Sequence, residues 1–415
     1  MSKHQDFSVA EAKEKRLFYG YVIVATALLI DLILAGVHFT FGIFFKPVST
    51  EFGWTRAATS GAFTFYSIFH GALFIITGRI NDRFGPRLLL VASGLFMGLG
   101  YFLMSRISAI WQLYLFYGVI VSIGMSGGFV PLMSTVARFF VKRRGLMTGL
   151  VLAGGGIGQS ILPPLTSWLI ATFEWRTAYI LVGGSVFVLV ILWAQLLRRD
   201  PGQVRQVPYG SEEVASEGIT SQSRGLSLQQ AMSTKQFWLY CAAVVLAQFG
   251  IGMMIVHCVP HAIGLGMSPT SAASVMTTFA AVGIVARIVL GSAVDRIGGK
   301  RVLVATCLLI SVALLGLAGI RTIWSLYLFA AVFGFGFGGF VSVMSPLAAQ
   351  LFGLTSHGTI LGVTTFAATV GAGVGPLVAG AIFDATNSYS QAFLVAGVLS
   401  LCAFILALSL RPLRK

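Results

Sequence analysis

Long apolar segments alternate with short polar ones along almost the whole chain. A helix of about 20 apolar residues spans the hydrocarbon core of a bilayer. The pattern predicts twelve such spans, at residues 18–45, 57–79, 87–106, 109–139, 145–172, 177–198, 236–263, 269–294, 301–320, 322–352, 358–384 and 389–411. Membrane β-strands would alternate polar and apolar residues, and these segments do not. We therefore predict an all-α membrane protein with twelve transmembrane helices.

The spans divide into two related halves. The segment GRINDRFGPR begins at Gly78 and the similar GSAVDRIGGKR begins at Gly291, while LYLF occurs at Leu113 and again at Leu326. Both pairs are separated by 213 residues, and several glycines and prolines keep the same offset. A constant offset across several spans predicts two pseudo-symmetric six-helix bundles, with a binding site between them near the middle of the membrane.

One long polar stretch separates the two bundles and sets the expected domain limits. We expect a cytoplasmic tail at 1–17, a first bundle at 18–199, a cytoplasmic linker at 200–235, a second bundle at 236–411 and a short tail at 412–415. The polar N-terminal segment runs into a span that is too long for the apolar region of a signal peptide, and no small-residue cleavage site follows. We expect no cleaved signal peptide.

Composition and charge agree with a membrane location. Hydrophobic residues make up 56% of the 415 residues and charged residues only 10%, a balance that a water-exposed surface does not tolerate. The predicted segments on the side of both termini carry 22 of the 28 lysines and arginines, and those on the other side carry 5. This bias predicts cytoplasmic termini and a cell-membrane location. The net charge of +15 is spread over separate loops, which favours anionic lipid over nucleic acid as a partner.

Several classes of function lack their residues. The four cysteines lie in predicted spans without CxxC spacing, so neither a disulfide nor a metal site is expected. No ATP-binding GxxxxGK[ST] segment is present, and no nucleophile–base set stands out. We expect neither an enzyme nor a bound cofactor.

Two ionisable side chains of opposite sign lie deep in predicted spans. Arg287 is the only charge between Ser268 and Val294, and Asp31 lies near the centre of the first span. A bare charge in hydrocarbon costs roughly 2.5 to 17 kcal/mol, so such residues face a cavity, a partner or a ligand. The flat guanidinium matches a carboxylate. We predict that Arg287 binds the carboxylate of a small anion; the alternative is a structural ion pair.

Asp31 is the candidate for proton coupling. Burial disfavours the charged form of a carboxyl group and a nearby arginine favours it, so an acid between these influences exchanges a proton readily. His38 follows seven residues later on the same helical face and is the second candidate, either to share the proton or to tune the outer entrance; the alternative is a packed or interfacial histidine. The alternative for Asp31 is a neutral residue that hydrogen-bonds two helices together.

Three further residues are weaker candidates for the substrate site. They are Tyr117 in the fourth span, His257 in the seventh, and Phe335 in the glycine-rich tenth span beside Phe333 and Phe337. A phenol in lipid needs a hydrogen-bond partner, and the seventh helix is expected to be central. Plain packing is the alternative reading for each.

The repeated pattern G-x-x-x-D-R-x-G resembles the signature of the major facilitator superfamily, and the resemblance covers nearly the whole chain. The glycines let helices approach closely, and the aspartates are placed to cap a helix N-terminus or to pair with a basic residue. We expect these residues to latch one conformation of the two halves; the alternative is that they serve membrane topology alone. The expected latch residues are Gly78, Asp82, Arg83, Arg138, Gly291, Asp295 and Arg296.

Other segments narrow the resemblance. YGYVIV opens the first span, FGIFFKPVSTEFGWTRA closes it, and the eleventh begins GTILGVTTFAATVGAGVGP. These resemble bacterial members of the monocarboxylate transporter family, and the oxalate/formate-type antiporters are similar. The resemblance implies that Arg287 is the substrate arginine. Two features depart from the family: the acid one turn before that arginine is Gly283 here, and the lysine of the first span is absent, with His38 nearby and Lys46 only at the end.

Taken together, the residues and the resemblance predict a secondary active transporter of small monocarboxylates such as lactate or pyruvate. Proton-coupled symport by alternating access is the expected mechanism, with Asp31 in place of the missing family acid. The expected partners are the substrate, a proton and the bilayer, and the simplest form is a monomer. Two alternatives remain: an exchanger that swaps two carboxylates, and a transporter-like sensor that signals through the linker.

Overall fold

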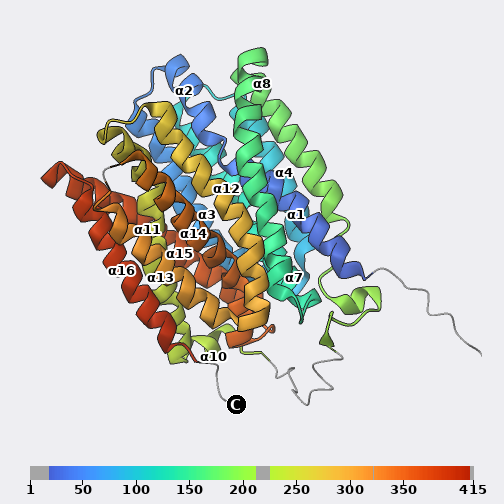
Figure 1. Cartoon of the computed structure of the whole chain (residues 1–415). Helices are drawn as coiled ribbons and strands as arrows, with labels where there is room; N and C mark the ends of the chain where they lie inside the picture. Colours follow the sequence, from blue (N-terminus) through green and yellow to red (C-terminus); the bar gives the residue numbers. More distant parts are fainter. Residues whose placement is uncertain (1–17, 212–224, 321, 412–415) are drawn as a thin grey trace, which may run out of the picture.

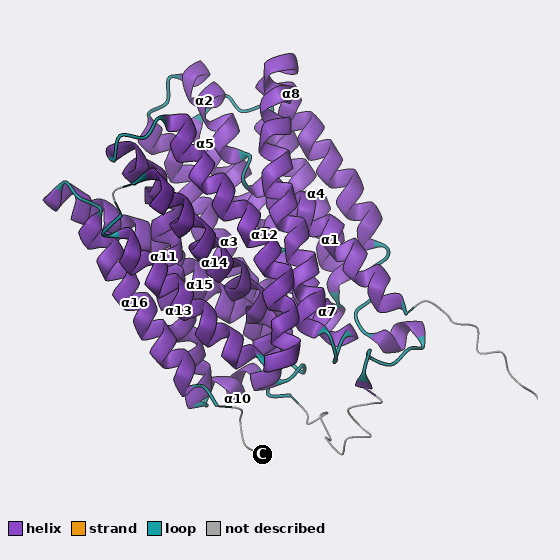
Figure 2. Cartoon of the chain, viewed as in Figure 1, coloured by secondary structure: helices purple, strands orange, loops and turns teal. Residues whose placement is uncertain are grey.

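The computed structural model describes residues 18–211, 225–320 and 322–411. Within these ranges the regular structure is helical, and the only β pairing is an isolated bridge between Phe140 and Tyr209 (Figure 2). The predicted tails at 1–17 and 412–415 and the middle of the predicted linker, at 212–224, lie outside the described residues. The all-α prediction is confirmed.

The helices of the first half run from α1 to α8 (Figure 1). They are α1 (Tyr19–His38), α2 (Phe41–Phe52), α3 (Arg56–Phe84), α4 (Pro86–Met104), α5 (Ile110–Leu113), the π-helical η1 (Tyr114–Val121), α6 (Ser122–Ser126), α7 (Phe129–Phe139) and α8 (Arg144–Ala194). The short 3-10 helix η2 (Pro201–Val204) and α10 (Leu228–Met232) belong to the connection. The second half consists of α11 (Lys235–Gly264), α12 (Pro269–Ile297), α13 (Gly299–Leu317), α14 (Ile323–Phe352), α15 (His357–Thr386) and α16 (Ser390–Ser409).

Eleven helical stretches among the described residues are long and apolar enough to cross a membrane. One of them is α8, whose 51 residues are interrupted at Glu174, where φ is 70°. A positive φ breaks the helical path at a residue with a side chain, so α8 makes two crossings. The described part of the chain therefore contains the twelve predicted crossings. The first is itself broken after His38, where α1 gives way to α2.

Local sequence signals explain where several long helices begin and turn. The hydroxyls of Thr55, Thr234 and Ser268 each accept a hydrogen bond from a first-turn N–H of α3, α11 and α12, as N-terminal caps do. Gly85 after α3 and Gly298 after α12 have φ of 86° and 90°, a conformation that glycine adopts without strain. These two turns are 213 residues apart and keep the repeat in three dimensions.

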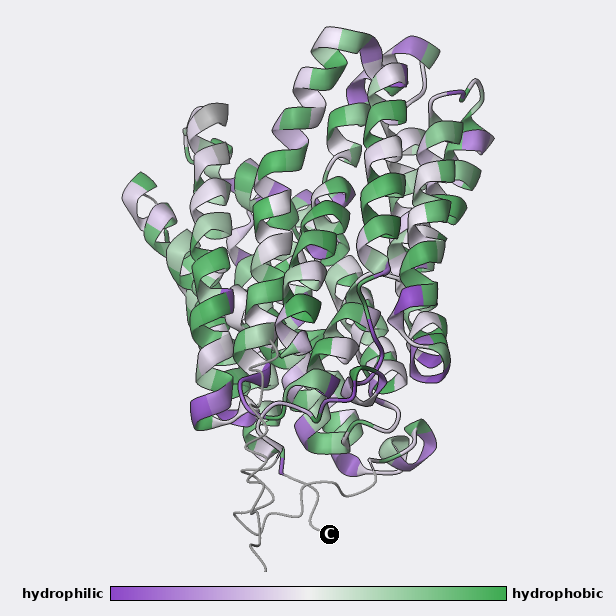
Figure 3. Ribbon diagram, turned by 90° about the vertical axis from the view of Figure 1, so that its right-hand side faces the viewer, coloured by the Kyte–Doolittle hydropathy of each residue, from purple (hydrophilic) through white to green (hydrophobic). Residues whose placement is uncertain are grey.

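Each half has its own apolar core. The buried hydrophobic residues form one cluster in the first half and another in the second, with Leu361 of α15 joining the first cluster. Many large apolar side chains remain exposed on the outside, for example Leu377, which is 74% exposed. Figure 3 shows apolar residues along the helices and polar residues gathered toward the two ends. Such a surface is suited to lipid.

The two halves meet mainly along two helix pairs, α8 with α12 and α3 with α15. Glycines bring the backbones into contact. A Cβ atom at Gly145 would lie 2.2 Å from the carbonyl oxygen of Gly291, and a Cβ at Gly78 would lie 2.2 Å from that of Gly358. Larger residues at these positions would push the halves apart, because backbone atoms cannot yield as a flexible side chain does.

The described ends of the connection dock on different halves. The N–H of Tyr209 donates to the carbonyl of Phe139 at 2.9 Å, at the end of α7. The N–H of Leu226 donates to the carbonyl of Phe352 at 2.8 Å, at the end of α14. The connection therefore lies at one end of the molecule, where α7 and α14 end.

Candidate functional site

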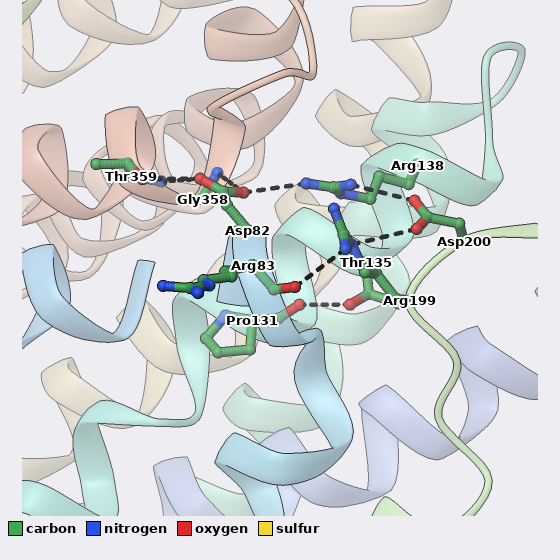
Figure 4. A network of polar contacts seen from close by, with 9 residues as sticks. All are labelled: Asp82, Arg83, Pro131, Thr135, Arg138, Arg199, Asp200, Gly358 and Thr359. Carbon is green, nitrogen blue, oxygen red and sulfur yellow. Dashed lines mark hydrogen bonds and ion pairs between the residues drawn. The ribbon is translucent and has the colours of Figure 1, made fainter. Parts of the chain in front are cut away.

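A first group of polar contacts ties the halves together at the end where α7 and α14 end, which we call the latch end. Asp82 of α3 accepts hydrogen bonds from the N–H of Gly358 at 3.0 Å and from the N–H and hydroxyl of Thr359, both at 2.8 Å (Figure 4). These donors belong to the first turn of α15, where the helix dipole favours a negative charge. Asp82 of the first half thus caps a helix of the second.

Arg138 of α7 holds Asp82 from the other side. Its Nη2 lies 3.0 Å from Asp82 Oδ1 and its Nη1 lies 3.1 Å from Asp200 Oδ1 (Figure 4). Asp82 and Arg138 have side chains only 12% and 11% exposed, so solvent screens this pair less than a surface ion pair. One guanidinium therefore connects the latch to the start of the connection between the halves.

The same arrangement recurs in the second half, 213 residues later. Asp295 at the end of α12 accepts hydrogen bonds from the N–H groups of Gly145 and Leu146, at 2.7 and 2.8 Å. These groups form the first turn of α8. Each half therefore offers an aspartate that caps a long helix of the other, and the closely packed glycines lie beside each cap.

The expected latch residues are not equally placed. Gly78, Asp82, Arg138, Gly291 and Asp295 lie at the contact between the halves. Two others are exposed on the surface: Arg83, whose guanidinium lies 5.1 Å from the ring of its neighbour Phe84, and Arg296. The structure adds two elements that sequence reasoning missed, which are the capped first turns of α8 and α15. Gly145 and Gly358 lie in these turns and are separated by the 213-residue offset of the repeat, which is the signal that would have indicated them.

A second group surrounds Arg287 in α12. The side chain is only 7% exposed, and its Nη1 donates a hydrogen bond of 2.6 Å to the carbonyl oxygen of Leu152 in α8. The ring of Phe337 from α14 lies 5.9 Å from the guanidinium carbon. The Nε atom is buried and has no hydrogen-bond partner, although a buried donor is costly to leave unsatisfied. Arg287 thus joins the two halves and has a buried Nε donor without a partner.

Asp31 lies close to this arginine on the other side of α8. It is 8% exposed, and its carboxyl group and the guanidinium act on each other electrostatically. None of the ion pairs among the described residues joins them directly. The carboxyl group and the guanidinium lie near each other in a region of low dielectric constant. Because they are not in direct contact, both groups remain available to other partners.

Two adjacent glycines of α8 make this arrangement sterically feasible. A Cβ at Gly155 would lie 2.4 Å from Oδ2 of Asp31, and a Cβ at Gly156 would lie 2.6 Å from Nη1 of Arg287. Both side chains therefore reach the α8 backbone only because these positions lack a side chain. Glycines in membrane helices commonly serve close helix packing, and these two also lie against the ionisable side chains.

The remaining candidates lie in three other places. The ring of Tyr117 lies 4.7 Å from that of Tyr66, whose hydroxyl is 2.9 Å from Nδ1 of His38. His257 Nε2 is 3.0 Å from the carbonyl oxygen of Pro376, and no described contact joins it to Arg287. Phe335 is half-buried; the phenylalanine beside Arg287 is Phe337.

No group of three His, Cys, Asp or Glu side chains comes together within the described ranges. Arg287 and Asp31 are a buried cation and acid between the helices, and such a pair can bind a small anion and exchange a proton.

Comparisons with known proteins agree with this organisation. A family profile, that of the Major Facilitator Superfamily, matches residues 27–263 and again 241–415. The chain is 27% identical over 411 residues to monocarboxylate transporter 12 of Mus musculus, covering 94% of this chain and 84% of that protein. It is 28% identical over 393 residues to monocarboxylate transporter 13 of Rattus norvegicus, covering 94% and 87%.

Solved structures show the same fold at low sequence identity. The human organic anion transporter MFSD10 is similar with a TM-score of 0.73 at 15% identity, covering 94% of this chain and 99% of that one. The E. coli fucose:proton symporter FucP is similar with a TM-score of 0.71 at 16% identity, covering 94% and 99%. With both of its halves matched by the family profile, the chain belongs to the major facilitator superfamily, whose members are transporters and not enzymes.

Proposed function

We propose that this protein is a secondary active transporter of small monocarboxylates such as L-lactate or pyruvate, and that it carries each together with one proton across the cell membrane. The observation that carries the proposal is Arg287, which is buried between the halves beside Asp31 and has a free Nε donor. A planar guanidinium binds a carboxylate through two parallel hydrogen bonds. The names of the related monocarboxylate transporters support the same class of substrate.

The pair supplies a simple account of proton coupling. In the empty carrier Asp31 is ionised and partly neutralises Arg287. When Asp31 takes up a proton, the guanidinium loses this compensation and attracts the substrate carboxylate more strongly. Carboxylate and proton enter together, so the net charge of the site stays the same, and the loaded halves rearrange without burying an additional charge.

The latch gives the second part of an alternating-access cycle. The caps made by Asp82 and Asp295 close the halves at the latch end, so the structure corresponds to the state that is closed there. Opening on that side must break both caps and separate the glycine contacts. The excess of lysine and arginine in the segments at this end supports its assignment to the cytoplasm.

Uptake of labelled L-lactate into proteoliposomes tests the proposal. We expect accumulation above the outside concentration when the vesicle interior is alkaline, and loss of accumulation in Arg287→Gln. Uptake only into vesicles preloaded with a carboxylate would instead identify an exchanger. Neither uptake nor exchange with any monocarboxylate of two to four carbons would contradict the substrate assignment.

A further inference from the structure

A second buried polar cluster lies in the first half, away from Arg287. His38 ends α1, and its Nδ1 is 2.9 Å from the hydroxyl of Tyr66 in α3. The Tyr66 ring stacks on that of His70, one helical turn further along α3, with the ring centres 5.4 Å apart. The rings of the two histidines are 6.3 Å apart. Three groups able to hold or pass a proton thus form a compact row from α1 into α3, joined by a hydrogen bond at its first step and by ring stacking at its second.

One end of this row opens into a cavity. A pocket of ≈ 330 Å³ is lined by His38 together with Phe39, Phe41, Gly42, Phe45 and Phe63. It lies where the first span is broken between α1 and α2, at the end opposite the latch. His38 is the polar member of this lining, and the other members are four phenylalanines and a glycine.

The other end of the row is a base without a partner. His70 interacts with the backbone of Met125, while its Nε2 atom is buried and has no hydrogen-bond partner. In the neutral tautomer that carries its hydrogen on Nδ1, the Nε2 atom has a lone pair that can accept a proton. Buried polar atoms normally have partners, so His70 presents an open site for one proton.

The row also reaches the depth of the Arg287 site. His70 lies 14 residues from each end of α3, which is about 21 Å at 1.5 Å per residue and places it midway through the membrane. Asp31 lies 12 residues into the 20-residue α1, or about 18 Å from its start. His38 lies about 10 Å further along the same helix than Asp31, in the direction away from the latch end. The row thus leads from the pocket to the level of Asp31.

We propose that His38, Tyr66 and His70 form a proton path that loads the carrier from the pocket. A proton from water binds His38 Nε2, and the Nδ1 proton of His38 passes to the Tyr66 oxygen. The original hydroxyl proton of Tyr66 passes through a water molecule to His70 Nε2, so His38 and Tyr66 end neutral, as they began, and His70 ends as the protonated imidazolium that holds the added charge. The proposal rests on the proton-coupled transport proposed above and assigns the groups that supply its proton.

The surroundings contain few competing groups. The titratable side chains beside Tyr66 in the row are Tyr117 on η1 and Tyr101 on α4. Helix α15 meets α3 where Gly71 contacts Thr369, and α15 has no titratable residue from 358 to 383. Among the described residues no ion pair includes either histidine. Tyr117 belongs to η1, a π-helical segment of the kind often found at functional sites.

Two measurements on the same proteoliposomes separate proton delivery from substrate binding. The first is lactate uptake driven by an inside-alkaline gradient, with the internal pH followed by a trapped dye. The second is exchange of labelled for unlabelled lactate at equal pH on both sides, which requires no net proton movement. The variants are Tyr66→Phe, which removes one hydroxyl, and His70→Gln, which stays polar but cannot be protonated. Tyr114→Phe is the matched control, because that hydroxyl donates to the Ala58 carbonyl at 2.9 Å, outside the row.

We expect gradient-driven uptake to fall at least tenfold in Tyr66→Phe and His70→Gln, with exchange within twofold of wild type, and Tyr114→Phe to match wild type in both. Unchanged gradient-driven uptake in both variants would overturn the path and leave the proposed transport intact. Loss of exchange as well would also overturn it, since the row would then serve folding or substrate binding. Wild type that exchanges lactate but never accumulates it would reject the proton coupling itself.

Discussion

The guanidinium of Arg287 in the second half donates a hydrogen bond of 2.6 Å to the carbonyl oxygen of Leu152 in the first half. The group that joins the halves at this level, through Nη1, is therefore the same guanidinium that we propose binds the substrate carboxylate. Substrate and backbone carbonyl compete for the guanidinium, so binding of a carboxylate is expected to weaken this contact between the halves. In the proposed cycle, this weakening is expected to link recognition of the substrate to the movement between the halves.

Replacement of Arg287 by lysine tests whether geometry or charge alone is required. Lysine keeps the positive charge but loses the planar fork. Hydrogen bonds to charged groups contribute about 1.5–3 kcal/mol each, so losing one corresponds to a factor of about 10 to 100 in affinity. We expect the KM for lactate uptake in Arg287→Lys to rise by at least tenfold. A KM within twofold of wild type would contradict a bidentate contact.

The two glycines of α8 give a steric test of the same site. A Cβ at Gly156 would lie 2.6 Å from Nη1 of Arg287 and 2.5 Å from Cγ1 of Ile284. We expect Gly156→Ala to displace the guanidinium and to reduce lactate uptake by tenfold or more, measured at equal protein per vesicle. Gly184→Ala, later in α8, is the matched control, because a Cβ there has no neighbour within 4 Å. Equal activity of the two variants would argue against a tight site at Gly156.

Replacement of Asp31 by asparagine should separate proton coupling from exchange. In the proposed cycle the protonated acid is the form that loads substrate, so wild-type uptake falls as the outside pH rises. Asparagine resembles that neutral form at every pH. We expect Asp31→Asn to lose gradient-driven accumulation, to keep lactate exchange, and to show exchange that is nearly independent of pH. Full accumulation by this variant would show that another group carries the proton.

The latch is tested by how readily a reagent reaches a side chain that is buried between the two halves. Asp295 caps α8 with its charge, and such contacts contribute about 0.3–2 kcal/mol, or up to about thirtyfold in a conformational equilibrium. A cysteine at Val294, which is buried against Gly145, reports opening through its reaction with a maleimide. We expect Asp295→Asn to speed this labelling severalfold, while Arg296→Gln, next in the chain but not part of the cap, leaves it unchanged. Equal rates in the two variants would remove Asp295 from the latch.

Arg138 and Arg83 offer a second matched pair at the latch. Arg138 bridges Asp82 and Asp200, while the side chain of Arg83 is exposed on the surface. Removing the partner of a partly buried acid leaves its charge uncompensated. We expect Arg138→Gln to lower the melting temperature of the purified protein by several degrees and Arg83→Gln to leave it unchanged. A similar melting temperature for both variants would mean that the bridge contributes little.

The sequence predicted the helices well because membrane spans are long and uniformly apolar, and the 213-residue offset predicted both halves. Asp82 and Asp295 were expected at helix N-termini or beside basic residues, and the structure shows which helices they cap. The partner of Arg287 was not predictable, because it is the backbone carbonyl of Leu152, and no residue type marks a free carbonyl. Spacing alone also does not show which of Phe333, Phe335 and Phe337 lies beside Arg287. That depends on how α14 is rotated about its axis, and the structure places Phe337 there.

The central claim is that Arg287 binds the carboxylate of the substrate, and calorimetric titration of the purified protein tests it most directly. L-lactate is titrated into wild type and into Arg287→Gln, and lactamide, which has the same shape without the charge, is titrated into wild type. The account predicts saturable binding of lactate to wild type, with no detectable binding in the other two titrations. Equal binding of lactate by Arg287→Gln, or of lactamide by wild type, would contradict it.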